Sequence, residues 1–187
     1  MIPPNAKKVF SGKIFDVYQW EQKMFDGSTA IFESVKRPNT VDIIAIVGDK
    51  ILYLEQEQPH EAVSFACLPG GRVDDKEEAL AAAKRELAEE TGYVSDQWEL
   101  FHTSHKAGKV DFTINTFLVK NAQHRQDQNL DPGERIKVKF ITFEEFLDLA
   151  DADNFQHASL RPLLIKAKYN KQTGAELRKR LFGTGKN

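Results

Sequence analysis

Apolar and polar residues alternate along much of the first third of the chain, which is the period of a β-strand. Two alternating stretches flank the Asp-Gly dipeptide at 26–27, a strong signal for a tight turn. Residues 9–37 are therefore predicted to form an antiparallel hairpin or small meander. The run VDIIAIV at 41–47 is apolar almost throughout, which predicts a strand buried on both faces, and residues 50–58 predict its neighbour.

The pattern changes to that of a helix after residue 74. Asp75 and Glu78 have the spacing of a capping box, and the interior that follows is rich in alanine. Leu80 and Leu87 lie on one stripe of the helical wheel, which predicts that this stripe faces the core. Gly92 stands where a left-handed cap ends a helix.

Strands and helices continue to alternate to the end of the chain, which predicts a mixed α/β protein. Thr142 and Glu145 have the spacing of a capping box for a helix from 143. A last helix is predicted from Ser159 to 171, with a tail from 173 that forms a short helix or frays. The remaining segments are strands at 64–71 (entering a glycine turn), 98–104, 112–120 and 135–142, a polar loop at 105–111 and a long loop at 123–134.

Three carboxylates near the end of the alanine-rich helix break two local rules. Glu86, Glu89 and Glu90 are spaced so that they repel one another, and they face the negative end of the helix dipole. A divalent cation would turn this repulsion into attraction, and Mg²⁺ prefers oxygen ligands. A solvated acidic face beside Lys84 and Arg85 would need no metal, so the helix alone leaves both interpretations open.

The composition of the 187 residues narrows the class of protein. The formal net charge of −2, with 41% hydrophobic and 29% charged residues, is typical of a globular chain and gives no sign of a nucleic-acid-binding surface. No stretch predicts a membrane span or a secretory signal. The single cysteine, Cys67, excludes an internal disulfide framework and is interpreted as a small buried residue, so a cytoplasmic location is expected.

The stretch from Gly71 to Tyr93 is much more specific than the helix alone. It reads G-x5-E-x7-R-E-L-x-E-E-x-G-Y, a complete match to the signature of the Nudix hydrolases, and the chain therefore resembles that family. The resemblance implies an α/β (α+β) fold, an α/β/α sandwich with a mixed sheet, in which the signature forms loop, helix and loop. It also implies hydrolysis of a diphosphate linked to another moiety, with Mg²⁺ or Mn²⁺ as cofactor.

The resemblance further implies a role for each position of the signature. The metal ligands would be the carboxylates of Glu86 and Glu90, with Glu89 sharing a second metal or acting through water, and the backbone carbonyl of Gly70. The supporting and substrate-side residues would be Arg85 and Glu77, which orient the carboxylates, Gly71 and Arg72 beside the substrate, and Gly92, which closes the motif.

Over most of residues 8–167 the chain is similar to the ADP-ribose and nucleoside-diphosphate-sugar pyrophosphatases. This implies a small-molecule nucleotide substrate, an N-terminal antiparallel extension at 1–40 before a hydrolase domain at 41–187, and a homodimer that exchanges the extension. Phe32 would stack on the base, with Glu33 and Arg37 nearby, although packing of Phe32 within the hairpin is an equally good interpretation.

One further residue and several alternatives complete the expectations. Glu134 on the long loop is the candidate that positions the attacking water, ahead of Asp127 and Asp131. Cys67 and Ala107-Gly108 replace a glutamate and a proline that are common in enzymes for ADP-ribose, so other nucleoside-diphosphate sugars stay open. The alternatives are an enzyme for nucleoside triphosphates or dinucleoside polyphosphates, which usually lacks the hairpin, and a non-catalytic nucleotide-sugar sensor, which usually has a damaged signature.

Overall fold

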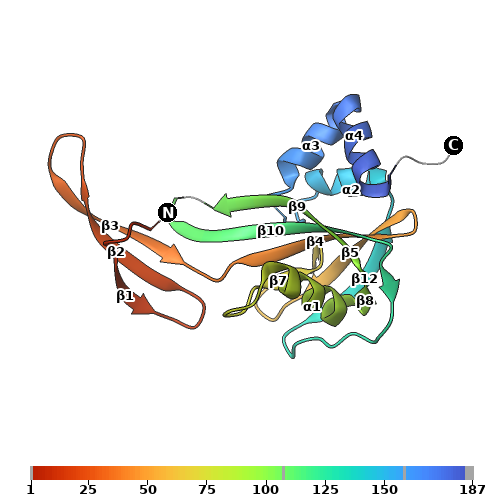
Figure 1. Ribbon diagram of the computed structural model, residues 1–187, viewed down its shortest axis with the longest axis horizontal. Helices are drawn as coiled ribbons and strands as arrows, with labels where there is room; N and C mark the ends of the chain where they lie inside the picture. The colour runs from red at the N-terminus through yellow and green to blue at the C-terminus, as the bar shows by residue number, and fades with distance from the viewer. Residues whose placement is uncertain (1, 107, 158, 184–187) are drawn as a thin grey trace.

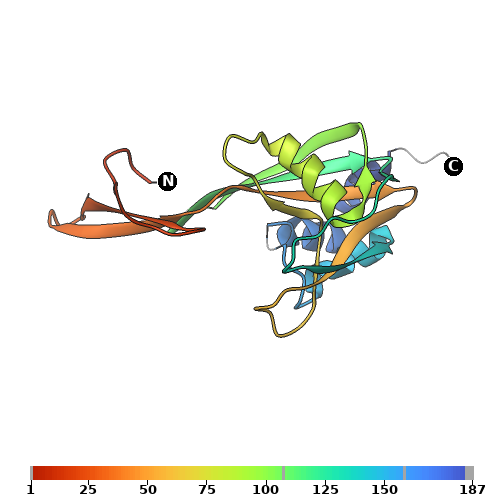
Figure 2. The same cartoon turned by 90° about the horizontal axis from the view of Figure 1, so that it is seen from below.

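The computed structural model describes residues 2–106, 108–157 and 159–183. A ten-stranded mixed sheet forms its centre, with helix α1 on one face and helices α2, α3 and α4 on the other (Figures 1 and 2). The α/β/α sandwich expected from the sequence is therefore confirmed. Ala107, where the family often has proline, lies outside the described residues.

The elements follow the chain in a regular order. The strands are β1 (Lys7–Ser11), β2 (Asp16–Lys23), β3 (Thr29–Lys36), β4 (Thr40–Val47), β5 (Lys50–Glu57), β6 (Phe65–Cys67), β7 (Gly70–Arg72), β8 (Tyr93–Val94), β9 (Gln97–Lys106), β10 (Val110–Lys120), β11 (Gln123–His124) and β12 (Arg135–Ile141). The helices are α1 (Ala79–Thr91), α2 (Phe143–Asp148), a 3₁₀ turn (Leu149–Asp151), α3 (Arg161–Tyr169) and α4 (Lys171–Phe182).

Strand β10 joins the N-terminal extension to the main sheet. The path through the sheet is β1-β2-β3-β10-β4-β5-β12, and β10 runs parallel to both β3 and β4. Only Val110 and Asp111 pair with β3, whereas residues 114–119 of β10 pair with β4. The predicted hairpin at 9–37 is present with β1 as a third strand, and this extension projects away from the helices (Figure 2).

Strand β4 separates two hydrophobic cores, as its apolar sequence predicts. Ile44 and Ile46 pack into the core under α2, α3 and α4, whereas Ile43 and Ala45 pack into the core under α1. This division follows from the period of two in a strand, which sends successive side chains to opposite faces. A sheet buried on both faces holds its strands rigidly, and the residues between β6 and α1 are built on this base.

The start of α1 differs from the prediction. Glu78 precedes the helix without a side-chain cap, so the capping box predicted at Asp75 and Glu78 is wrong. Instead, the neighbouring carboxylate of Glu77 bonds to the backbone just before the helix. It accepts a hydrogen bond of 3.0 Å from the backbone N–H of Asp74 and another of 3.0 Å from Arg85, so a contact with the far part of the helix has overridden the local signal.

The buried face of α1 also differs in one position. Leu80 is 39% exposed, so its predicted place on a core stripe is wrong, whereas Leu87 is fully buried. Ala82 and Ala83 are fully buried as well, and their small side chains bring the helix axis close to the sheet. The helix therefore packs on its alanine face, which lies beside the glutamates.

The later segments mostly follow the prediction. The capping box of Thr142 and Glu145 is confirmed, and the polar loop predicted at 105–111 is largely strand, because β9 and β10 form a long hairpin. The loop at 123–134 begins with β11, which pairs with β8. Residues 173–182 of the predicted tail belong to α4, whose Leu177 and Leu181 are buried. No helix of the described residues is long and apolar enough to cross a membrane.

The end of α1 supplies a test of the packing. Gly92 has a φ of 73°, and a Cβ there would overlap the backbone carbonyl of Gln126. Gly48 has a φ of 61° but open space around it. We expect Gly48→Ala to lower the free energy of unfolding by about 1 kcal/mol, the cost of the left-handed backbone, and Gly92→Ala by at least about 2 kcal/mol. Urea denaturation measures both, and equal losses would contradict the close contact with the loop.

Candidate active site

Two glycines bring the β7 strand into close contact with both the sheet and α1. Gly70 and Gly71 pair with Asp42 and Val41 of β4 in antiparallel register. Gly70 has a φ of 158°, and a Cβ there would overlap the Val41 carbonyl, while a Cβ on Gly71 would overlap the carboxylate of Glu86. Only glycine fits at Gly70, and a side chain at Gly71 would displace the Glu86 carboxylate, so the backbone of this turn lies directly against the acidic face of the helix.

Arg85 organises the outer part of the acidic cluster. Its Nε and Nη2 donate to the two oxygens of Glu77, each at 3.0 Å, in the bidentate geometry of a strong ion pair. Its Nη1 donates to Glu86 Oε1 at 2.9 Å and to Glu89 Oε2 at 3.1 Å, and Nη2 also reaches the Arg72 carbonyl at 3.0 Å. One guanidinium thus ties three carboxylates to the turn, and these contacts raise the pKa of Arg85 further above its ordinary value.

Glu90 forms the inner part of the cluster. It is 4% exposed, and its Oε2 accepts a hydrogen bond of 2.8 Å from the Gly70 backbone N–H. Burial raises the pKa of Glu90 well above its ordinary value, and the negative charges of Glu86, Glu134 and Glu89 add to the effect. In contrast to Glu86 and Glu89, Glu90 forms no ion pair with a cationic side chain of the described residues.

Glu86 and Glu134 share the same electrostatic environment. Burial raises the pKa of Glu86, the adjacent Arg85 partly opposes this, and the charges of Glu89 and Glu134 reinforce it. Burial likewise raises the pKa of Glu134, and the charges of Asp131 and Glu89 contribute. Glu134 on the long loop is therefore close enough to α1 for the charge of Glu89 to raise its pKa.

The long loop reaches the helix because it caps the helix end. The Asn129 backbone N–H donates to the Glu89 carbonyl at 2.8 Å, and the Gln128 side chain donates to the Glu90 carbonyl at 2.6 Å. These bonds satisfy carbonyls that have no partner within a helix. They also fix the loop so that Glu134, a few residues later, faces the cluster.

The donor set fits a hard divalent cation. The cluster offers carboxylate oxygens and the Gly70 turn, and Glu90 is a buried carboxyl group with no cationic partner among the described residues. No three His, Cys, Asp or Glu side chains of the described ranges converge into a complete set of ligands as they stand. Arg85 holds Glu86 and Glu89 in ion pairs.

Two cavities that share Gln58 are lined by residues of the site: Gly70 and Gly71 line one, and Glu134 lines the other. The first, here called the arginine pocket, has a volume of about 330 Å³ and is lined among others by Arg37, Phe112, Gly70 and Gly71. The Arg37 guanidinium lies 4.8 Å from the centre of the Phe112 ring, and its buried Nε has no hydrogen-bond partner among the described residues. A cation held over an aromatic ring without a carboxylate is suited to bind an anion.

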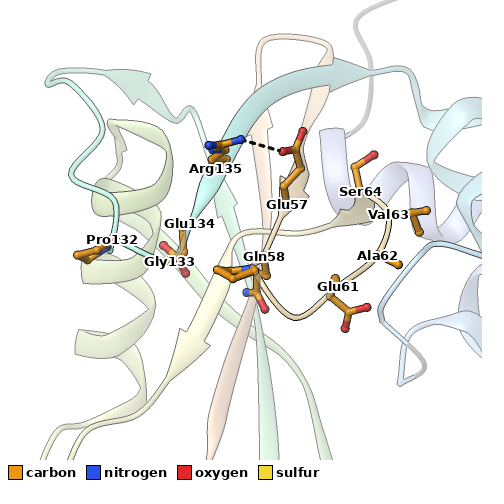
Figure 3. Close-up of a pocket in the computed structure, with 11 residues that line it drawn as sticks. Glu57, Gln58, Glu61, Ala62, Val63, Ser64, Pro132, Gly133, Glu134 and Arg135 are labelled. Carbon is orange, nitrogen blue, oxygen red and sulfur yellow. Dashed lines mark ion pairs between the residues drawn. The ribbon is translucent and has the colours of Figure 1, made fainter.

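The second cavity, here called the glutamate pocket, has a volume of about 570 Å³. Figure 3 shows it between the segment 58–64 on one side and residues 132–135 on the other. Glu57, Glu61 and Glu134 line it, and its one lining cation, Arg135, lies 3.7 Å from Glu57. Such a cavity offers many hydrogen-bond acceptors and little positive charge, which suits a neutral, hydroxyl-rich group.

The remaining predicted substrate residues lie outside these cavities. Phe32 and Glu33 are on β3 in the extension, where Phe32 is 40% exposed and its ring centre lies 6.1 Å from that of Trp20. Glu33 accepts a hydrogen bond from Gln19 at 3.1 Å. The side chain of Arg72 is exposed and lies 3.5 Å from Asp74. Of the predicted substrate residues, Arg37 and Gly71 line the arginine pocket.

Several residues of the site carried no signal in the sequence. Phe112 and Asp42 read as ordinary strand residues, and His157 as part of a loop, yet all three line the arginine pocket. Cys67 is buried as predicted, its thiol donates to Gln56 at 3.2 Å, and burial raises its pKa, which makes it a poor nucleophile.

The sequence profile described as NUDIX domain matches residues 36–164. The chain belongs to the Nudix family. It is a Nudix hydrolase, a class of enzymes that act on nucleoside diphosphate derivatives. The matched range covers the signature, both cavities and the whole sheet except the extension.

Two relatives and one solved structure show the same likeness. The chain is 29% identical over 151 residues to a protein named ADP-ribose pyrophosphatase of Bacillus subtilis (strain 168), covering 78% of this chain and 80% of the relative. It is 29% identical over 146 residues to the methanol dehydrogenase activator of Bacillus methanolicus, covering 76% and 79%. A crystal structure of ADP compounds hydrolase superposes with a TM-score of 0.75 at 19% identity, covering 97% of this chain and 95% of that one, and supports the fold.

The buried charge of Glu90 predicts a pH-dependent stability. Below the ordinary pKa of 4.5 the carboxyl is protonated in both folded and unfolded chains. As the pH rises from 4.5 to the raised pKa of Glu90 in the folded chain, the unfolded chain releases a proton that the folded chain keeps, so stability falls until the folded chain has lost that proton too. We expect Glu90→Gln, measured with EDTA at pH 8, to unfold with a free energy higher than wild type by about 1–3 kcal/mol.

Urea denaturation from pH 5 to pH 8 checks this expectation, and the difference should shrink towards pH 5. The exposed Glu99, which pairs with Arg180, supplies the control variant Glu99→Gln, which should not show the trend. Equal stability of Glu90→Gln and wild type at every pH would contradict the buried charge.

Proposed function

We propose that this Nudix hydrolase cleaves the diphosphate bond of ADP-ribose or another nucleoside-diphosphate sugar, releasing a nucleoside monophosphate and a sugar phosphate. The observation that carries the proposal is a pair of cavities of opposite character that share Gln58, of which one is lined by Gly70 and Gly71 and the other by Glu134. The relative named ADP-ribose pyrophosphatase supports the same substrate class.

The reaction is proposed to require Mg²⁺, with Mn²⁺ as a substitute. Glu86, Glu89, Glu90 and the Gly70 carbonyl would hold the cation. When bound, it supplies positive charge that neutralises the diphosphate and makes a water molecule easier to deprotonate. Glu86 and Glu89 must then share their oxygens between the cation and Arg85, and the bidentate pair with Glu77 keeps Arg85 in place.

The chain's own residues divide the remaining work. Glu134 accepts the proton of the attacking water, since its raised pKa brings it closer to the working pH of a general base. Arg37 binds a phosphate oxygen of the nucleotide half in the arginine pocket. Glu57 and Glu61 accept hydrogen bonds from sugar hydroxyls in the glutamate pocket. The diphosphate then spans the boundary between the cavities, beside Glu90.

A homodimer formed through the extension is part of the proposal. The extension is a three-stranded sheet that exposes large apolar side chains, and a sheet of this kind needs a covering surface to be stable. A second copy of the chain would cover it and would bring Phe32 and Glu33 to the nucleotide of its partner. A cytoplasmic location also remains a proposal. The exposed apolar residues of the extension are Val9, Phe10, Ile14, Phe15, Phe25, Ile31 and Phe32.

A phosphate-release assay tests the activity. The purified protein with Mg²⁺ and a coupled phosphatase should turn over ADP-ribose or a nucleoside-diphosphate sugar faster than nucleoside triphosphates or diadenosine polyphosphates. Glu90→Gln should lower kcat by at least about 100-fold, because the buried carboxylate is lost from the cluster. Glu99→Gln, on the exposed end of β9, should retain the wild-type rate.

Each outcome of this assay has a defined meaning. A ranking led by triphosphates would refute the sugar-nucleotide assignment. Binding of ADP-ribose without any turnover would refute the hydrolase proposal and identify a sensor.

Arg37 offers a second test of the substrate's position. Arg37→Ala should raise KM for ADP-ribose by about 10- to 100-fold, because a hydrogen-bonded ion pair to a phosphate oxygen contributes about 1.5–3 kcal/mol. Arg37→Lys keeps the charge but lacks the forked geometry, so its KM should lie between the two. Arg178→Ala, which removes a distant pair with Glu144, is the control. An unchanged KM in Arg37→Ala would exclude the arginine pocket as the phosphate site.

A further inference from the structure

His157 is a buried histidine in the segment before α3, on the face of the sheet opposite to α1. It is 9% exposed, and both ring nitrogens have partners. The Leu68 backbone N–H donates to Nε2 at 2.7 Å, and Nδ1 lies 3.1 Å from Asp42 Oδ2. Since Nε2 accepts a hydrogen bond, it carries no proton, and the ring proton is on Nδ1, directed at the Asp42 carboxylate.

The segment that carries His157 is fixed to the sheet. The Ala66 N–H donates to the Asn154 carbonyl at 3.0 Å, and the Gln156 N–H donates to the Ala66 carbonyl at 3.0 Å. Phe155 thus forms an isolated parallel bridge with Ala66 of β6. On the other side, the Leu160 N–H donates to the His157 carbonyl at 3.0 Å, so the backbone of His157 is bonded toward α3 as well.

The residues that His157 contacts lead directly to the acidic cluster. Leu68, Pro69 and Gly70 are consecutive, and each is anchored to a different element. Leu68 bonds to His157, the Pro69 carbonyl accepts from the Ile43 N–H of β4 at 2.8 Å, and the Gly70 N–H donates to Glu90 of α1 at 2.8 Å. The direction of the Gly70 carbonyl depends on all three anchors.

The His157 imidazole is the hydrogen-bond partner of the buried Leu68 N–H. Leu68 is 2% exposed, so without the imidazole its N–H would be a buried donor with no partner, which costs about 1–3 kcal/mol. The following proline has no N–H and restricts the backbone of Leu68. Loss of the anchor would therefore be relieved by a shift of the turn rather than by a new bond within it.

We propose that His157 and Asp42 are positioning residues of the active site, which fix the turn at 68–70 and thereby orient the Gly70 carbonyl and the Glu90 carboxylate toward the cation. This inference rests on the proposed function. The support is geometric: Asp42 orients the imidazole, the imidazole holds Leu68, and Leu68 is two residues from Gly70, whose N–H is bonded to Glu90.

Two amide variants separate the two contacts of His157. In His157→Gln the amide oxygen reaches roughly the place of Nε2, so the bond to Leu68 is kept and the contact with Asp42 is lost. In His157→Asn the amide reaches only the place of Nδ1, so the contact with Asp42 is kept and the bond to Leu68 is lost. The readout is the dissociation constant for Mn²⁺ without nucleotide, from the paramagnetic resonance signal of the free ion, with Glu90→Gln defining the binding that belongs to this site.

We expect His157→Asn to weaken Mn²⁺ binding by about 10- to 100-fold and to lower kcat similarly, with KM for ADP-ribose within about twofold, as for residues that orient metal ligands. His157→Gln should bind Mn²⁺ within about threefold of wild type. Unfolding temperatures are recorded for each variant, because a residue with a purely structural role would lower that temperature and leave the affinity of the folded protein unchanged.

Asp42→Asn keeps the inference testable if His157→Asn does not fold. It retains an oxygen for the Nδ1 proton but removes the charge, and its Mn²⁺ affinity should lie between those of wild type and His157→Asn. Folded His157→Asn or Asp42→Asn with wild-type Mn²⁺ affinity would overturn the inference, as would equal losses in His157→Gln and His157→Asn. Failure to cleave ADP-ribose with Mn²⁺ binding intact would refute the proposed function alone.

Discussion

The crowding of negative charge at the end of α1 is the constraint on which the rest of the structure depends. Glu86, Glu89 and Glu90 oppose one another and the helix dipole, and two of them are largely buried. Arg85 offsets part of this charge, but its contacts stop at the outer carboxylates. Two neighbouring segments stabilise this end of the helix. The glycine turn donates an N–H to Glu90, and the long loop caps the helix carbonyls.

The two faces of the sheet are connected through this site. The helix that carries the glutamates lies on one face, whereas His157 precedes α3 on the other, and both bond to the turn at 68–70. Strand β4 lies between them and contributes Asp42 and the Ile43 N–H. Elements on both faces of the sheet therefore fix the position of the turn at 68–70. His157 follows the signature helix in the chain, yet it contacts the turn that leads into the signature.

The sequence was most informative where the determinants are local. The strand at 41–47, the left-handed cap at Gly92 and the capping box at Thr142 depend on neighbours in the chain, and the structure has all three. The start of α1 could not be predicted, because Glu77 pairs with Arg85, which lies eight positions later in the chain. Asp42 and His157 are far apart in the sequence and carry no motif, so only the tertiary structure brings them together.

The charge constraint also links stability to function. Under the proposed function, carboxylates that repel one another in the absence of a cation would become its ligands, and cation binding to the folded chain would stabilise that chain by mass action. Hydrogen bonds and ion pairs that removed this repulsion completely would occupy the carboxylate oxygens that a cation would need as ligands. Arg85 illustrates the balance, because it neutralises Glu86 and Glu89 from the side while leaving the buried Glu90 without a cationic partner among the described residues. Under the proposed function, the negative charge that Arg85 leaves at Glu90 is the charge that would attract a divalent cation.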